Sequence, residues 1–248
     1  MSDGRTSASL ARRSIAEAVG TSLLLATVVG SGIMGDRLSG GNVGIALLAN
    51  TIATGAALVA LILTFGPISG AHFNPVVTLG AALERALGVE DVPYYLAAQL
   101  IGAVAGVGIA NLMFDLPAIS LSQHARHGAS QLLAEFVATF GLLSVIRGCA
   151  KMREPSVVAF AVGAYITAAY WFTSSTSFAN PAVTVARCLS DTFAGIRPVD
   201  VPGFVIAQLA GGMAGIALWR WLAPDEPLAA DDDEAVAPRL KRASGQRS

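Results

Sequence analysis

Long apolar stretches alternate with short polar segments along the whole chain. Two of these stretches carry one acidic residue each and four carry no charge; they cover residues 14–35, 43–65, 92–114, 129–145, 155–171 and 201–219. A helix over the 23 residues of 43–65 is about 34 Å long, which is enough to cross a bilayer core of about 30 Å. The pattern therefore predicts six membrane-spanning helices.

Two shorter apolar segments begin with the same pattern, Asn-Pro-small-Val-Thr, at residues 74–78 and 180–184. Proline suits the first position of a helix because its missing N–H would be unpaired there, and asparagine is a favoured N-cap. Each copy therefore predicts a short helix that begins inside apolar surroundings. Irregular backbone is costly in lipid unless it lines a cavity or is buried in protein, so the two copies indicate a membrane pore or carrier.

Further features of the first half recur in the same order in the second half. The matched positions are Glu17 with Glu135, Thr21 with Thr139, and Gln99 with Gln208. Each repeat holds three predicted spans, an odd number, so the second repeat must insert upside down. The predicted fold class is an all-α membrane protein with six transmembrane helices and two re-entrant half-helices that meet near the middle.

Composition and charge narrow the function further. The chain is 54% hydrophobic and 13% charged, with a formal net charge of −1. No basic patch points to nucleic acid, and we expect no cofactor, no bound metal and no enzymatic activity. The expected partners are small neutral solutes and the lipid bilayer.

The basic residues predict the orientation in the membrane. They precede the first span, lie between the fourth and fifth, and follow the sixth, which the positive-inside rule places in the cytoplasm. We therefore expect a multi-pass protein of the inner (plasma) membrane with both termini cytoplasmic and no cleavable signal peptide. The expected parts are a segment 1–13, a channel domain 14–222 with repeats at about 14–115 and 129–222, and a disordered tail 223–248.

The sequence of residues 69–75, Ser-Gly-Ala-His-Phe-Asn-Pro, resembles the first signature of the major intrinsic protein family, the aquaporins and aquaglyceroporins. The doubled Asn-Pro box and the repeated Glu-x-x-x-Thr and Ala-Gln pairs follow the repeat of that family. The resemblance covers roughly residues 10–222. It implies an aquaporin-like fold, channel activity and assembly as a homotetramer.

The half-helices suggest how a pore would work. A helix N-terminus carries about half a positive charge, so two facing N-termini oppose cations at the pore centre. Asn74 and Asn180 can donate side-chain hydrogen bonds to a passing solute. The resemblance also implies a ladder of backbone carbonyl acceptors, at Gly70, Ala71, His72, Phe73, Thr176 and Phe178.

Glu17 and Glu135 are the only carboxylates inside the predicted spans. Their equivalent positions favour a structural role in which each accepts hydrogen bonds from the N–H groups of a re-entrant loop. A proton relay is the alternative. His72 is interpreted as a polar residue bonded within its loop, with a pH gate as the alternative.

The resemblance places an outer constriction, or selectivity filter, at Thr54, Ala168, Ser177 and Val183. Family members normally have arginine where this chain has Val183. All four residues are small and uncharged, so we expect a wide, weakly polar filter without a fixed cation, as in bacterial members that lack the arginine.

Arg187 follows Val183 by four residues and therefore lies on the same helix face, about one turn away. Side chains lean toward the helix N-terminus, so Arg187 could supply a displaced charge to the outer vestibule. Pairing with Asp191 or contact with lipid headgroups are the alternatives.

These features predict a passive channel for small neutral solutes, with arsenite or methylated arsenicals considered beside glycerol and water. A glycerol or polyol facilitator is the close alternative. A proton-coupled secondary transporter that uses Glu17 and Glu135, or a junction protein with little flux, would belong to other classes.

Overall fold

The computed structural model describes residues 8–150 and 155–223, and every regular element in them is helical. The elements are α1 Leu10–Leu38, α2 Val43–Ser69, α3 Pro75–Leu83, η1 Val89–Asp91, α4 Val92–Met113, α5 Ala129–Ala150, α6 Pro155–Phe172, α7 Pro181–Arg187, η2 Pro198–Asp200 and α8 Val201–Leu222. The predicted all-α membrane fold class is confirmed. The predicted 224–248 part of the tail and residues 1–7 lie outside the described residues.

Five of the described helices are long and apolar enough to cross a membrane: α1, α2, α4, α5 and α8. The sixth predicted span, α6, is apolar over the 17 residues from Ser156 to Phe172, which is about 26 Å of helix. Two boundaries differ from prediction. α1 begins at Leu10, behind an N-cap at Ser9, so residues 10–13 are helical rather than part of a terminal segment. α2 continues through Pro67 to Ser69, and its C-cap Gly70 has a φ of 89°, which suits glycine.

The spanning helices form two similar groups. α1 packs against α4 and α2, whereas α5 packs against α8 and α6. Glycines bring the closest pairs together: a Cβ at Gly102 would lie 2.1 Å from the carbonyl oxygen of Ala18, and one at Gly211 would lie 2.2 Å from that of Phe136. Only glycine permits this approach, and it occurs at equivalent places in the two groups.

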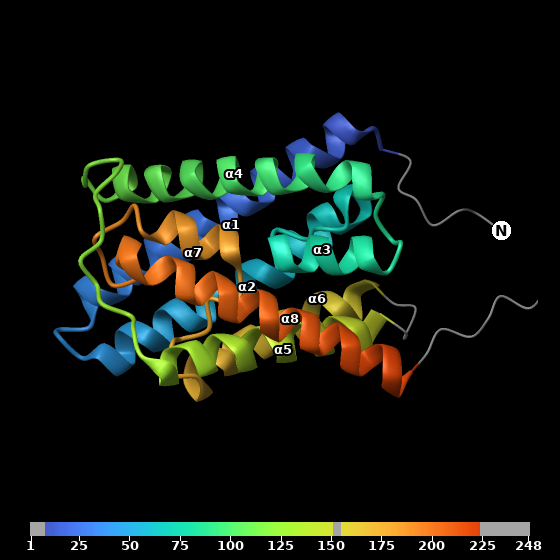
Figure 1. Ribbon diagram of the computed structural model, residues 1–248. Helices are drawn as coiled ribbons and strands as arrows, with labels where there is room; N and C mark the ends of the chain where they lie inside the picture. Colours follow the sequence, from blue (N-terminus) through green and yellow to red (C-terminus); the bar gives the residue numbers. More distant parts are fainter. Residues whose placement is uncertain (1–7, 151–154, 224–248) are drawn as a thin grey trace, which may run out of the picture.

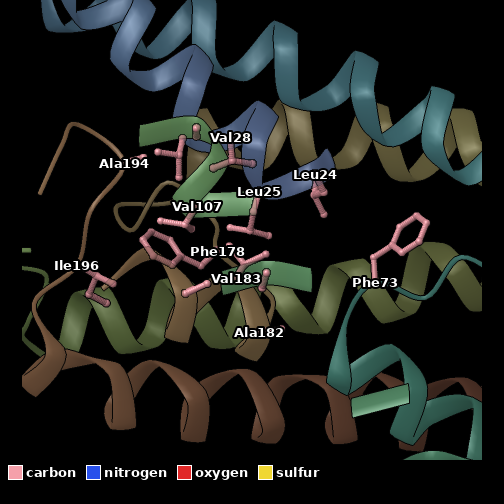
Figure 2. Packing of buried hydrophobic residues seen from close by; sticks show 14 of the residues in the cluster. Leu24, Leu25, Val28, Phe73, Val107, Phe178, Ala182, Val183, Ala194 and Ile196 are labelled. Atoms are coloured by element: carbon pink, nitrogen blue, oxygen red, sulfur yellow. The ribbon is translucent and has the colours of Figure 1, made fainter. Parts of the chain in front are cut away.

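The half-helices α3 and α7 lie between these groups and toward opposite ends of the molecule (Figure 1). α1 begins and α8 ends at the same end, the one nearer α3 (Figure 1). Figure 2 shows Ala182 and Val183 of α7 packed in a cluster with Leu25 of α1 and Val107 of α4. Val76 of α3 belongs to the second cluster, which contains residues of α5, α6 and α8. Each half-helix therefore helps to build the core around the other repeat's helices.

Candidate functional site

The start of each half-helix is set by its Asn-Pro pair. Asn74 is the N-cap of α3, and its side chain accepts a hydrogen bond from the N–H of Val76 at 2.9 Å. Asn180 caps α7 in the same way through the N–H groups of Ala182 and Val183. Proline occupies the first turn of both helices. The predicted helix starts are confirmed.

The two caps also join the half-helices to each other. The side-chain amide of Asn74 donates to the carbonyl of Ala179 at 2.8 Å, and the amide of Asn180 donates to the carbonyl of Phe73 at 2.7 Å. An asparagine side-chain amide has two N–H donors, so Asn74 and Asn180 each keep one N–H that is not used in these two bonds. Both asparagines line the same cavity, where the second donor can meet a solute.

The loops before the half-helices share a strained backbone. Residues at equivalent positions have positive φ: Ala71 and Ser177 at 49° and 50°, Phe73 and Ala179 both at 48°. A left-handed conformation costs a non-glycine residue about 1–2 kcal/mol. Strain of this kind persists only where the surroundings impose it, and it turns successive peptide groups to different sides of the chain.

The carbonyls named for a ladder differ in their surroundings. The carbonyl of Phe73 accepts from Asn180. Four of the other named residues line the cavity, and their carbonyls accept no hydrogen bond from any described residue. They are Gly70, Ala71, His72 and Phe178. Thr176 does not line it, and its hydroxyl accepts from Arg126 instead. No described residue donates to the backbone carbonyl of Thr176, and its place in the ladder stays a prediction.

Glu17 and Glu135 are fully buried, and each carboxylate accepts four hydrogen bonds. Glu17 accepts from the Ser69 hydroxyl, the N–H groups of His72 and Phe73, and the Gln99 amide.

Glu135 repeats this set with Ser175, Phe178, Ala179 and Gln208, at distances from 2.5 to 2.9 Å. Bonds to a carboxylate are stronger than neutral ones. Each carboxylate thus holds its own loop in the strained form.

His72 is bonded within the same region. Its Nδ1 lies 3.1 Å from the Thr78 hydroxyl, and its ring lies against Tyr95 with the ring centroids 5.3 Å apart. Thr78 in turn accepts from Gln99 at 2.9 Å. His72 also lines the cavity.

One elongated cavity, about 270 Å³ in volume, connects these features. Its lining runs from Arg187, Val183 and Thr54, past the two asparagines, to Glu84 and Arg147. We call its two ends the Arg187 end and the Glu84 end. Apolar side chains of α1, α2, α5 and α6 make much of the remaining wall, so the polar groups form a narrow track in a low-dielectric surrounding.

Three of the four residues expected at the filter line this cavity, namely Thr54, Ser177 and Val183. The hydroxyl of Ser177 is buried and has no hydrogen-bond partner among the described residues. Val183 is 5% exposed.

The prediction for Ala168 is wrong: this residue is exposed on the outer face of α6. The buried stripe of α6 contains Val162, Ile166 and Tyr170, and two helix positions rotate Ala168 by about 200° away from Tyr170. Tyr170 lines the cavity, and its hydroxyl lies 3.4 Å from that of Thr54. Ala168 was assigned to the filter by its spacing from Asn180, with no gap allowed. The connection between α6 and Asn180 is short, so the residue of α6 that faces the cavity is Tyr170, two positions after Ala168.

Arg187 lies at the same end of the cavity and is only 2% exposed. Its Nε donates to the carbonyl of Ala194, and its Cζ lies 3.4 Å from the centre of the Phe178 ring. Its two terminal nitrogens have no hydrogen bond to any described residue and are not sealed from the cavity. Asp191 instead accepts from the N–H of Gln123. The structure shows neither a pair with Asp191 nor contact with headgroups, so the contacts support the alternative of a displaced charge in the vestibule. The expectation of a wide filter without a fixed cation at position 183 stays a prediction.

Arg126 was not recognised from the sequence. It is 8% exposed and donates to the carbonyls of Gly195 and Ser175 at 2.8 and 3.1 Å. Its Cζ lies 4.9 Å from the Phe178 ring centre, so this ring contacts two guanidinium groups. A polar loop arginine gives no sequence signal that separates such a role from a solvated one.

Comparisons with known proteins agree with this geometry. The sequence profile of the family described as Major intrinsic protein matches residues 5–157 and 149–245. The chain is 53% identical over 230 residues to aquaglyceroporin AqpS of Rhizobium meliloti, covering 92% of this chain and 98% of that protein. It is 32% identical over 251 residues to aquaporin AqpM of Methanothermobacter marburgensis, covering 86% and 98%. The fold resembles the X-ray structure of the aquaglyceroporin from Plasmodium falciparum, with a TM-score of 0.71, 21% identity, and coverage of 87% and 98%.

Proposed function

The chain belongs to the major intrinsic protein family, and from this premise we propose that it is a passive channel for water, glycerol and other small neutral solutes. As a member of this family it is a multi-pass membrane channel protein and not an enzyme. We further propose the inner (plasma) membrane, both termini in the cytoplasm and a homotetramer. The Glu84 end of the cavity then opens to the cytoplasm, and the Arg187 end is the outer mouth.

The observation that carries the proposal is the position of the two asparagines. The N-termini of α3 and α7 face one another across the crossed Asn74 and Asn180 bonds, in the middle of the cavity. Partial positive charge and free amide donors at this point favour neutral solutes with acceptor groups and oppose cations. The unpaired loop carbonyls accept from solute hydroxyls, which replace hydration water along the track.

A proton-coupled transporter is the less favoured class. A relay carboxylate must take up and release a proton during transport, but Glu17 and Glu135 each accept four hydrogen bonds, two of them from backbone N–H groups of their own re-entrant loops. Protonation of either would break part of the support for a strained loop. These contacts support a structural role for both.

The outer mouth supports solutes of glycerol size. Val183 and Thr54 are small, and Tyr170 supplies one aromatic wall with a hydroxyl. Ser177 also lines this part of the cavity. Undissociated arsenite is a neutral trihydroxide and meets the same requirements, so we propose it as a second solute; methylated arsenicals, which are bulkier, test the width of the mouth.

Stopped-flow swelling of proteoliposomes tests this proposal. The wild-type protein should conduct water and glycerol faster than protein-free vesicles. Val183→Arg adds a bulky donor at the mouth and should reduce glycerol and arsenite permeability more than water permeability. Val183→Leu adds volume without a charge and serves as the matched control. Wild-type vesicles that swell like protein-free ones would contradict the channel, and an unchanged solute-to-water ratio in Val183→Arg would remove residue 183 from the constriction.

A further inference from the structure

The Glu84 end of the cavity contains a charged pair that belongs neither to the crossed asparagines nor to the re-entrant loops. Glu84 terminates α3 as its C-cap, and Arg147 lies in the last turn of α5. The Arg147 Nε lies 2.6 Å from a Glu84 carboxylate oxygen, and both side chains line the cavity. Their exposed fractions are 15% and 16%, so most of each ion's hydration has been lost.

The pair continues a contact between α3 and α5. A Cβ at Gly80, one turn before Glu84, would lie 3.3 Å from the Leu143 side chain, which is one turn before Arg147. The pair therefore extends the contact between α3 and α5 by one helical turn, to the mouth of the cavity. Removing two ions from water is costly, and a buried ion pair often adds no net stability compared with apolar residues. The pair is not explained by stability alone.

The internal repeat also indicates that the Glu84–Arg147 pair is not part of the structural framework. A shift of 106 residues relates α3 to α7, and one of 118 relates α1 to α5. The corresponding positions in the other repeat are Ser190 and Val29, which carry no charge. The buried carboxylates that hold the loops are duplicated, whereas the Glu84–Arg147 pair occurs at one end alone.

The end of α3 has another partner that serves as its cap. Arg220 donates to the carbonyl of Leu83 at 2.6 Å, where a positive charge favours the end of a helix. Arg147 is thus not required for that purpose, although it also contacts the same region through Glu84.

We propose that Glu84 and Arg147 form a second specificity determinant, a polar constriction that solutes cross at the end of the cavity opposite Arg187. This inference rests on the proposed channel function. A hydroxyl group donates to the carboxylate and accepts from the guanidinium, so an uncharged polyol can exchange hydrogen bonds with both partners. An ion of either sign is attracted by one partner and repelled by the other. The solute class selected is therefore small, uncharged molecules with several hydroxyl groups.

The chain offers a matched control pair. Arg13, near the start of α1, and Asp91, the N-cap of α4, lie 2.9 Å apart, with exposed fractions of 18% and 16%. α1 begins at the end of the molecule nearer α3 (Figure 1). Neither residue lines the cavity described here. The control therefore has the same charges and a similar exposure but no access to the solute.

The experiment compares the two double alanine variants, Glu84→Ala with Arg147→Ala and Arg13→Ala with Asp91→Ala, in proteoliposomes with equal amounts of protein. Xylitol and water permeabilities are measured by stopped-flow light scattering. Loss of the mouth pair removes the hydrogen bonds that it exchanges with a polyol and should lower the xylitol-to-water ratio by about twofold to tenfold, the range that the net free energy of one hydrogen bond allows. The control should keep the wild-type ratio. Equal ratios in all three proteins would overturn the proposal.

Two further variants keep the test decisive if the alanine variant does not assemble. Exchange of the two side chains, Glu84→Arg with Arg147→Glu, should keep the wild-type ratio. Glu84→Gln removes the negative charge from the mouth at nearly constant side-chain size and should increase chloride leak; an unchanged leak overturns the proposal. Absence of glycerol flux in the wild type would contradict the channel itself, whereas normal wild-type flux with an insensitive ratio contradicts the role of the pair.

Discussion

Replacement of Glu135 by glutamine tests whether this carboxylate holds the second re-entrant loop. The N–H of Ala179 and the Gln208 amide bond one oxygen at 2.8 and 2.6 Å, and the Ser175 hydroxyl and the N–H of Phe178 bond the other. A glutamine amide has one acceptor oxygen and one donor nitrogen. Either orientation of the new side chain leaves a backbone N–H facing another donor.

The cost follows from these contacts. One buried donor without a partner costs about 1–3 kcal/mol, and the remaining bonds lose their charge assistance. Relief of the buried charge offsets part of this loss. A net destabilisation of about 2–4 kcal/mol corresponds to a fall in Tm of roughly 4–16 °C for a chain of this size.

The assay is thermal unfolding of the detergent-purified protein, together with the yield of monodisperse protein. Glu17→Gln should behave in the same way, because its four partners are equivalent. Glu90→Gln, at an exposed position of η1, is the control and should leave Tm unchanged. Glu135→Gln protein of normal yield and Tm that has lost only a pH dependence of transport would refute the structural role and favour a relay.

Two predictions concern the outer mouth. Tyr170→Ala should raise the xylitol-to-water permeability ratio because it removes an aromatic wall, and Ala168→Leu should leave it unchanged because residue 168 faces outward; the opposite pattern in stopped-flow would restore Ala168 to the filter. Arg187→Ala should raise potassium leak and lower chloride leak, because the Arg187 charge repels a cation and attracts an anion in the vestibule. Two unit charges about 6 Å apart interact by roughly 2–3 kcal/mol at an effective dielectric constant of 20. An unchanged ratio of the two leaks would remove Arg187 from the vestibule.

The sequence carried enough information for the fold because the signals were physical and repeated. Long apolar runs, the Asn-Pro helix starts and the duplicated Glu and Gln positions predicted spanning helices and two half-helices. Helix ends were less certain, as α2 shows by continuing through Pro67 to Ser69. There the apolar run ends before the hydrogen-bonded helix does.

The filter was predicted less well because it depends on how helix ends and loops are placed in space. Ala168 was chosen by counting residues, but the buried stripe through Ile166 and Tyr170 determines which face of α6 meets the cavity. That stripe was available in the sequence as a helical spacing of larger side chains. The position of Arg187 over Phe178, and the pairing of Glu84 with Arg147, join segments that no local pattern relates.

The central claim is that flux through this protein is passive, and solute accumulation under an imposed proton gradient tests it most directly. Proteoliposomes containing the wild-type protein are loaded with labelled glycerol at equal concentrations inside and outside, and a pH difference is then imposed. The account predicts that the inside and outside concentrations stay equal, while exchange of label is faster than in protein-free vesicles. Accumulation of glycerol against its gradient would contradict the account.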